Sequence, residues 1–249
     1  MPLIGIFVHG GSFCLTQDTV GQLDAILDPW YPGLRGASAV ADAVFGAFSP
    51  AGRTPVTWYF SDNALPRDRG DMSLYANAST GSPGLTYRFY EAPQDMPVVF
   101  SFGEGLTYST FSVKGVDAPT NVSACEHLNI SVTIANVGDV ESDIVVTVFL
   151  LQQDVGFPNP ISRLVTFSRL PAVEAGGERA LRLPPITAAY RSIVKDEGAG
   201  SIYDVKGKRF GITARQALFC CVARRAQRAS GRRYPFSVQQ SSTQDLSTC

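Results

Sequence analysis

The hydrophobic pattern divides the chain into two parts that have different periods. Two short apolar runs, at residues 3–8 and 25–27, are typical of strands that are buried on both faces of a parallel sheet. The first run ends in a glycine turn at residues 9–12, and residues 18–25 predict a short helix. After residue 109 the apolar positions alternate with a period of two instead. The pattern therefore predicts an α/β part that is followed by an all-β part.

The clearest predicted helix covers residues 36–45. Gly46 stands where a helix C-cap is expected, and Pro50 prevents the helix from continuing. Residues 54–60 follow as a predicted strand. Strand–helix–strand–helix–strand is the pattern of a parallel sheet, but roughly sixty residues make too small a core for such a layered unit, which is therefore expected to be incomplete. The apolar residues of the helix fall at i, i+3, i+4, i+7 and i+8 on one face: Ala37, Val40, Ala41, Val44 and Phe45.

The pattern in the remainder of the chain predicts a linker and a β-sandwich. Residues 62–97 are rich in proline and glycine, and within them residues 86–90 alternate like a strand. Residues 100–111 lead from a glycine turn into a β segment. About seven short strands then predict an immunoglobulin-like sandwich, which is expected to be fibronectin III-like because it lacks a Cys–Trp–Cys signature. Its alternating segments are residues 130–135, 145–151, 164–167, 181–183, 190–194 and 210–213.

The predicted fold class is thus a partial parallel α/β sandwich domain followed by an all-β, fibronectin III-like sandwich of the immunoglobulin type. We predict the α/β portion at residues 1–62, a linker at 63–108 and the sandwich at 109–214. In residues 215–249 the period is lost, and arginine is concentrated at 224–233. A solvated, disordered tail is expected there, with an arm that binds an acidic partner as the alternative.

Composition narrows the classes of partner. The 249 residues have a net charge of −1, which gives no general case for nucleic acid or for a membrane surface. No apolar run approaches the ~20 residues that a membrane span needs. The N-terminus has neither the basic region nor the cleavage site of a signal peptide. We therefore expect no nucleic acid and no membrane as partner.

The spacing of the cysteines and the sequences that follow some asparagines give information about the cellular compartment of the protein. The five cysteines show no metal-ligand spacing, and their odd number leaves at least one unpaired within the chain. Asn77, Asn121 and Asn129 each begin an Asn-x-Ser sequence, which is the acceptor for N-glycosylation. These three residues are the predicted modification sites. These sequences are compatible with residence in the secretory pathway but do not establish it.

Four ordered segments resemble the C-terminal part of glycoside hydrolase family 3, especially its β-xylosidase and β-glucosidase members. The fourth segment is similar to the entry of that family's fibronectin III-like domain, and the resemblance weakens through the β-sandwich. Cys14 and Asp28 depart from the family pattern, the first near a position that is usually polar or acidic and the second in a strand that is usually apolar. The four segments are YPG at 31–33 with GASAVADAVFG at 36–46, SPAGRTPVTWY at 49–59, SPGLTYRFY at 82–90 and FGEGLTYSTF at 102–111.

The resemblance implies a secreted or extracellular β-glycosidase that acts on β-xylosides or β-glucosides of xylan and other cell-wall glycans. The family's nucleophile is an Asp in an N-terminal barrel, and its acid/base is a Glu in a loop upstream of this chain. Since neither region occurs here, we expect no catalytic residue, no cofactor and no metal site, and the chain alone is predicted to be inactive. A β-linked oligosaccharide is the implied partner if a barrel is present.

We also considered stand-ins for the missing groups. Retaining hydrolysis needs two carboxyl groups about 5–5.5 Å apart. Asp62 and Asp143 each follow a serine, as the family's nucleophile does, but neither follows a barrel strand, so both are interpreted as turn or linker residues. His9 and His127 are interpreted as residues of a turn or strand edge. Six aromatic residues are interpreted as packing rather than as sugar platforms: Trp30, Tyr31, Trp58, Tyr59, Tyr87 and Tyr90.

Two other interpretations of the whole chain remain. The chain can be a non-catalytic sandwich module that binds glycan or protein. It can also be a truncated gene product whose exposed sheet edge impairs folding.

Overall fold

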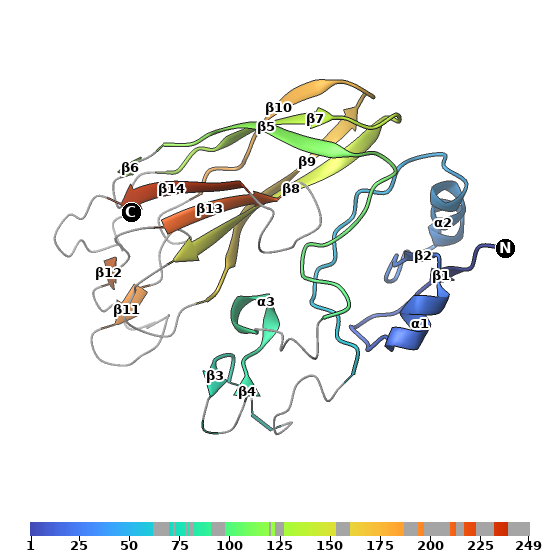
Figure 1. The fold of residues 1–249 in the computed structure, drawn as a ribbon, viewed down its shortest axis with the longest axis horizontal. Helices are drawn as coiled ribbons and strands as arrows, with labels where there is room; N and C mark the ends of the chain where they lie inside the picture. Colours follow the sequence, from blue (N-terminus) through green and yellow to red (C-terminus); the bar gives the residue numbers. More distant parts are fainter. Residues whose placement is uncertain are drawn as a thin grey trace.

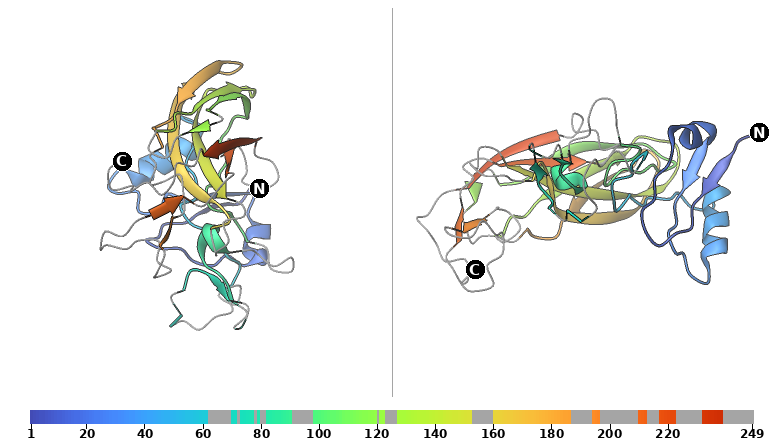
Figure 2. Two further views of the ribbon diagram at one scale, coloured as in Figure 1. Left: turned by 90° about the vertical axis from the view of Figure 1, so that its left-hand side faces the viewer. Right: turned by 90° about the horizontal axis from the view of Figure 1, so that it is seen from below.

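The structure is a computed structural model that places an α/β part beside an elongated pair of β-sheets (Figure 1). Figure 2 shows the α/β part at one end of the molecule, beyond the sheets. In the part of the chain that the structure describes, no helix is long and apolar enough to cross a membrane. The described residues are 1–61, 70–71, 73–77, 79, 82–90, 98–119, 121–122, 127–152, 160–186, 194–196, 210–212, 217–222 and 232–238.

The N-terminal part confirms the predicted pair of parallel strands and both predicted helices. Strand β1 (Ile4–Ile6) pairs with β2 (Ala25–Leu27), and helix α1 (Gln17–Gln22) supplies the crossover that a parallel pair needs. Thr16 caps α1, because its Oγ1 accepts a hydrogen bond from the Thr19 N–H at 3.2 Å. Helix α2 (Gly36–Val44) follows β2.

Two predicted strands are wrong. Residues 54–60 form no strand and share only one isolated antiparallel bridge, between Trp58 and Phe100. Residues 86–90 instead contain helix α3 (Thr86–Phe89), which the Tyr90 N–H closes by donating to the Thr86 carbonyl at 2.9 Å. Alternation over four or five residues does not distinguish one helical turn from a strand, so tertiary contacts decide.

The β part consists of two larger sheets and two short pairs. One sheet has the order β10-β7-β5, and the other has the order β6-β14-β13-β8-β9. The first sheet contains β5 (Phe111–Asp117), β7 (Ser131–Asn136) and β10 (Glu178–Arg182). The second contains β6 (Asn121–Val122), β8 (Ser142–Gln152), β9 (Arg163–Val173), β13 (Ala217–Val222) and β14 (Arg232–Val238). The short pairs are β3 (Ala76–Asn77) with β4 (Ser82–Pro83), and β11 (Val194–Asp196) with β12 (Phe210–Ile212).

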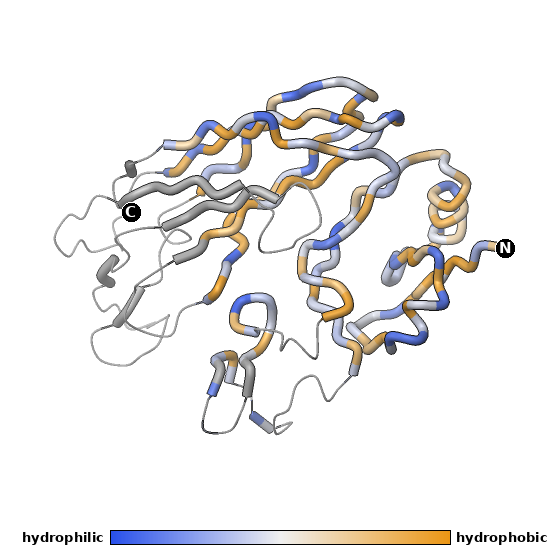
Figure 3. Tube along the Cα trace, in the orientation of Figure 1, coloured by the Kyte–Doolittle hydropathy of each residue, from blue (hydrophilic) through white to orange (hydrophobic). Residues whose placement is uncertain are grey.

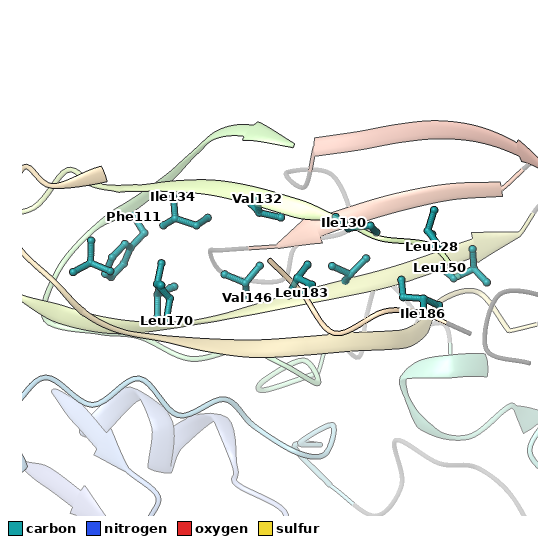
Figure 4. Close-up of a cluster of buried hydrophobic side chains, with 13 residues drawn as sticks. Phe111, Leu128, Ile130, Val132, Ile134, Val146, Leu150, Leu170, Leu183 and Ile186 are labelled. Atoms are coloured by element: carbon teal, nitrogen blue, oxygen red, sulfur yellow. The ribbon is translucent and has the colours of Figure 1, made fainter. Parts of the chain in front are cut away.

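The hydrophobic core lies between these two sheets (Figure 4). Figure 3 shows apolar residues recurring along the strands that enclose it. Because side chains alternate between the faces of a strand, every second residue points inward. Each fully buried Val, Leu or Ile contributes about 1.5–3 kcal/mol relative to its exposed state. The inward residues include Val132 and Ile134 on β7 and Ile144, Val146, Val148 and Leu150 on β8.

The C-terminal region differs from the disordered tail that the sequence predicts. Strand β13 pairs antiparallel with β8 from Ala217 opposite Gln152 to Val222 opposite Thr147, and β14 pairs with β13 on its other side. The segment ALFCCV is a continuous apolar run that suits a strand in the middle of a sheet. Because arginine-rich residues follow this segment in the sequence, composition alone does not indicate a strand here.

Candidate functional site

The carboxyl ends of the two parallel strands bring a histidine and an aspartate together. His9 follows β1 and Asp28 follows β2, and the His9 Nε2 lies 2.7 Å from the Asp28 Oδ1. Their side chains are only 12% and 19% exposed. This edge is where ligands bind in open α/β sheets, so the pair is the natural candidate site of the α/β part.

Both ring nitrogens of His9 are engaged. The Nδ1 lies 2.6 Å from the carbonyl oxygen of Gly11, on the side of the ring opposite Asp28. A carbonyl oxygen only accepts hydrogen bonds, so the Nδ1 donates to Gly11, and the Nε2 shares a second hydrogen bond with the Asp28 carboxyl group. Neither nitrogen is then available as a general base or as a metal ligand.

Three aromatic rings surround His9. Its ring centroid lies 4.7 Å from that of Phe13, 4.8 Å from that of Trp30 and 5.4 Å from that of Trp58. Trp58 is only 2% exposed, so it packs in the interior and presents no face to a sugar.

The same region contains buried donors without partners. Among the described residues, no acceptor lies within hydrogen-bonding distance of the Trp30 Nε1, the Trp58 Nε1 or one guanidinium nitrogen of Arg53. Leaving a buried donor unpaired costs about 1–3 kcal/mol. Trp30 also has a φ of 55°, a left-handed conformation that bulky residues rarely adopt. Burial lowers the pKa of Arg53 from its ordinary value.

The second and fourth family-like segments are clasped together. The Thr54 hydroxyl donates to the Ser101 carbonyl at 2.7 Å and accepts from the Glu104 N–H at 3.1 Å. The Glu104 carboxylate accepts from the Ser101 N–H at 2.9 Å. A side chain at Gly105 has no room, because a Cβ there would lie 2.5 Å from the Gly52 carbonyl oxygen.

The remaining segments join the same network. Tyr59 and Tyr90 pack edge to face with centroids 5.2 Å apart, and burial together with the neighbouring Tyr90 raises the pKa of Tyr59 to about 12. Tyr87 stacks on Phe102 at 3.9 Å. The Tyr108 hydroxyl donates to the Ala43 carbonyl at 2.7 Å, which connects the fourth segment to α2.

The sequence-predicted carboxylate stand-in that the structure describes has a structural role. The Asp143 Oδ1 accepts from the Ala172 N–H at 2.7 Å, and its Oδ2 accepts from the Arg169 Nε at 2.6 Å. The bond from Ala172 and then the contacts with Arg169 lower the pKa of Asp143. Asp62 lies outside the described residues. No group of three or more His, Cys, Asp or Glu among the residues described could hold a metal ion.

The other sequence-based candidates lie apart from this site. His127 is exposed just before the sandwich core. Asn77 lies on β3 and Asn129 lies just before β7, and both are exposed. Asn121 lies on β6, but its side chain is outside the description. The His9–Asp28 pair was missed, although the rule that parallel strands end at one edge, applied to the two predicted runs, could have found it.

The family model of the glycosyl hydrolase family 3 C-terminal domain matches residues 1–108. The probable beta-D-xylosidase 6 of Arabidopsis thaliana is 32% identical over 207 residues, which are 68% of this chain and 25% of that protein. The exo-1,4-beta-xylosidase xlnD of Emericella nidulans is 34% identical over 204 residues, covering 74% of this chain and 24% of that protein.

A solved structure shows the same fold. The GH3 exo-beta-xylosidase XlnD, in complex with a xylobiose aziridine probe, aligns with a TM-score of 0.77 and 24% identity over 96% of this chain. It covers 31% of that structure's chain. This chain spans about a quarter of the length of the curated relatives it matches. The resemblance seen in the four segments is thereby confirmed, and residues 1–108 belong to the glycosyl hydrolase family 3 C-terminal domain family.

Proposed function

We propose that this chain walls and braces the active site of a β-glycosidase that hydrolyses β-xylosides or β-glucosides, and that it does not perform the chemistry itself. The observation that carries this proposal is the engagement of two carboxylates near the family-like segments. Asp28 is held by His9, and Glu104 by Ser101. Retaining hydrolysis needs two carboxyl groups that act on the sugar, whereas each of these two is bound to another group of the protein.

The bracing role is supported by contacts between the two parts. The Ser49 Oγ, in the second family-like segment, accepts from the Tyr108 N–H at 2.8 Å and lies 2.7 Å from the Ser142 Oγ at the start of β8. Ser142 is only 3% exposed. These contacts fix the α/β part against the end of the sandwich, which suits a unit that holds a wall of an active site in place.

We also propose boundaries for the parts of the chain. Residues 1–62 are the α/β portion and 63–108 the linker, and the fibronectin III-like sandwich begins at 109. Strands β13 and β14 lie in the same sheet as β8, which supports extending the sandwich from 214 to Val238. For the intact protein, we propose a β-linked oligosaccharide as the partner. The proposed compartment of that protein is the secretory pathway or the cell exterior.

Turnover of an aryl β-xyloside and an aryl β-glucoside by the purified 249-residue chain tests the first claim. We expect no release of the phenol above the uncatalysed rate, because the Asp28 and Glu104 carboxylates are engaged by His9 and Ser101. Turnover that persists through purification would refute the claim. A calorimetric titration with xylo-oligosaccharide tests the non-catalytic binding module. Saturable heat without hydrolysis would favour that alternative.

A further inference from the structure

The hairpin formed by β3 and β4 carries the first of the three glycosylation sequences. We propose that Asn77 accepts an N-linked oligosaccharide. Asn77 lies on β3, and both Asn77 and Ser79 are exposed. Figure 1 and the left view of Figure 2 show β3 and β4 at the outer edge of the molecule, away from the two large sheets and from α2.

The hydroxyl that the acceptor sequence requires is in contact with the acceptor amide. The Ser79 hydroxyl donates to the Asn77 Oδ1 at 2.7 Å, and the Ser79 N–H donates to the same oxygen at 3.0 Å. Both bonds go to the amide oxygen, whereas the amide nitrogen Nδ2 is the atom that forms the bond to sugar. Because the contact spans only two residues, it can form in the chain before the tertiary fold does.

Asn129 lacks this arrangement. It is exposed, but it stands between Leu128 and Ile130, which are 0% and 2% exposed and fix the backbone against the core. Ser131 belongs to β7, which pairs on both sides. Both residues are described, and the Ser131 hydroxyl makes no hydrogen bond with the Asn129 amide. The Asn129 Oδ1 instead accepts from the Arg182 Nη2 at 3.5 Å.

The reaction requires a lipid-linked oligosaccharide as its second substrate. The Asn77 Nδ2 forms a bond with the anomeric carbon of the sugar, and the bond from that carbon to the diphosphate oxygen breaks. The lipid diphosphate leaves with the bonding electrons, and one amide proton is released. No redox change occurs.

The test is cell-free translation of the full chain behind a secretion signal, in the presence of microsomes. Only the protease-protected, translocated product is analysed, by its endoglycosidase-sensitive gel shift and by mapping of the glycopeptide. We expect a glycopeptide at Asn77 that Asn77→Gln and Ser79→Ala abolish and that Ser79→Thr retains, because threonine keeps the hydroxyl.

Asn129→Gln is the matched control and is expected to leave the Asn77 glycopeptide unchanged. A translocated chain that carries no glycan on Asn77, or one that carries it equally on the Ser79→Ala variant, would overturn the proposal. Both readouts concern the polypeptide and not its activity. They are therefore independent of whether the chain serves a glycosidase.

Discussion

His9 joins the two ends of the parallel strand pair, and its contribution can be measured by substitution. We expect His9→Gln to lower the free energy of unfolding by about 1–3 kcal/mol, because one amide group cannot replace both hydrogen bonds of the ring, to Asp28 and to the Gly11 carbonyl. Urea unfolding monitored by tryptophan fluorescence measures this, since Trp30 and Trp58 pack on His9. His127→Gln is the control, at the other histidine of the chain, which is exposed. Equal unfolding midpoints for the two variants would contradict the interpretation.

Asp143 makes a pH-dependent contribution. Its pKa in the folded protein is lower than the ordinary value of 3.8, so folding favours the carboxylate over the acid. The resulting stability is present above the unfolded pKa and is lost as the pH falls through the lower, folded pKa. We expect Asp143→Asn to be destabilising at about pH 6 and progressively less so as the pH falls below the ordinary value of 3.8, measured by urea midpoints at each pH. Asp117→Asn, at an exposed residue of β5, is the control, and a deficit that is independent of pH would exclude this role.

At the site, the sequence predicts the elements but not the contacts between their side chains. The glycine turn and the two apolar runs were visible in the sequence, but the His9–Asp28 contact depends on the register that places Ile6 opposite Leu27. Register is a tertiary property that no local pattern encodes. The positive φ of Trp30 is equally invisible, since glycine is the residue that signals such a conformation.

At the scale of elements, helix α2 shows a similar limit. The predicted boundaries are confirmed within one residue, yet its buried residues are Gly36 and Ala43 rather than the centre of the predicted apolar face. Phe45, on that face, is 88% exposed. Helical periodicity identifies the element and an apolar stripe, but packing decides which part of the stripe is covered.

Strand β13 allows a test between two interpretations of residues 215–249, namely a disordered tail and a part of the β-sandwich. If residues 215–249 were a disordered tail, a chain that ends at 214 would fold as well as the full chain. We expect it to aggregate or to unfold at lower urea, because β8 would become an apolar edge strand. A chain that ends at Val238 keeps β13 and β14 and is the matched control. Solubility and the urea midpoint are the measurements, and identical behaviour of all three chains would support the tail.

At the scale of the whole molecule, the bracing role requires the α/β part and the sandwich to unfold together. Ser49 is the residue to change, because its hydroxyl contacts both the Tyr108 N–H and the Ser142 Oγ. Replacing it with alanine leaves a buried hydroxyl and a backbone donor with fewer partners, at a cost of about 1–3 kcal/mol. The two-stranded sheet of the α/β part has little core of its own, so it should melt first once it is uncoupled.

Calorimetry distinguishes coupled from independent melting. We expect the unmodified chain to show one cooperative transition, and Ser49→Ala combined with Tyr108→Phe to show an earlier, smaller transition ahead of the main one. Ser38→Ala is the matched control, because Ser38 is exposed on α2. A single unshifted transition in the double variant would mean that the hydrogen bonds at Ser49 do not couple the two parts. The brace would then have to reside in the clasp of Thr54, Ser101 and Glu104, whose three hydrogen bonds join the second segment to the start of the fourth.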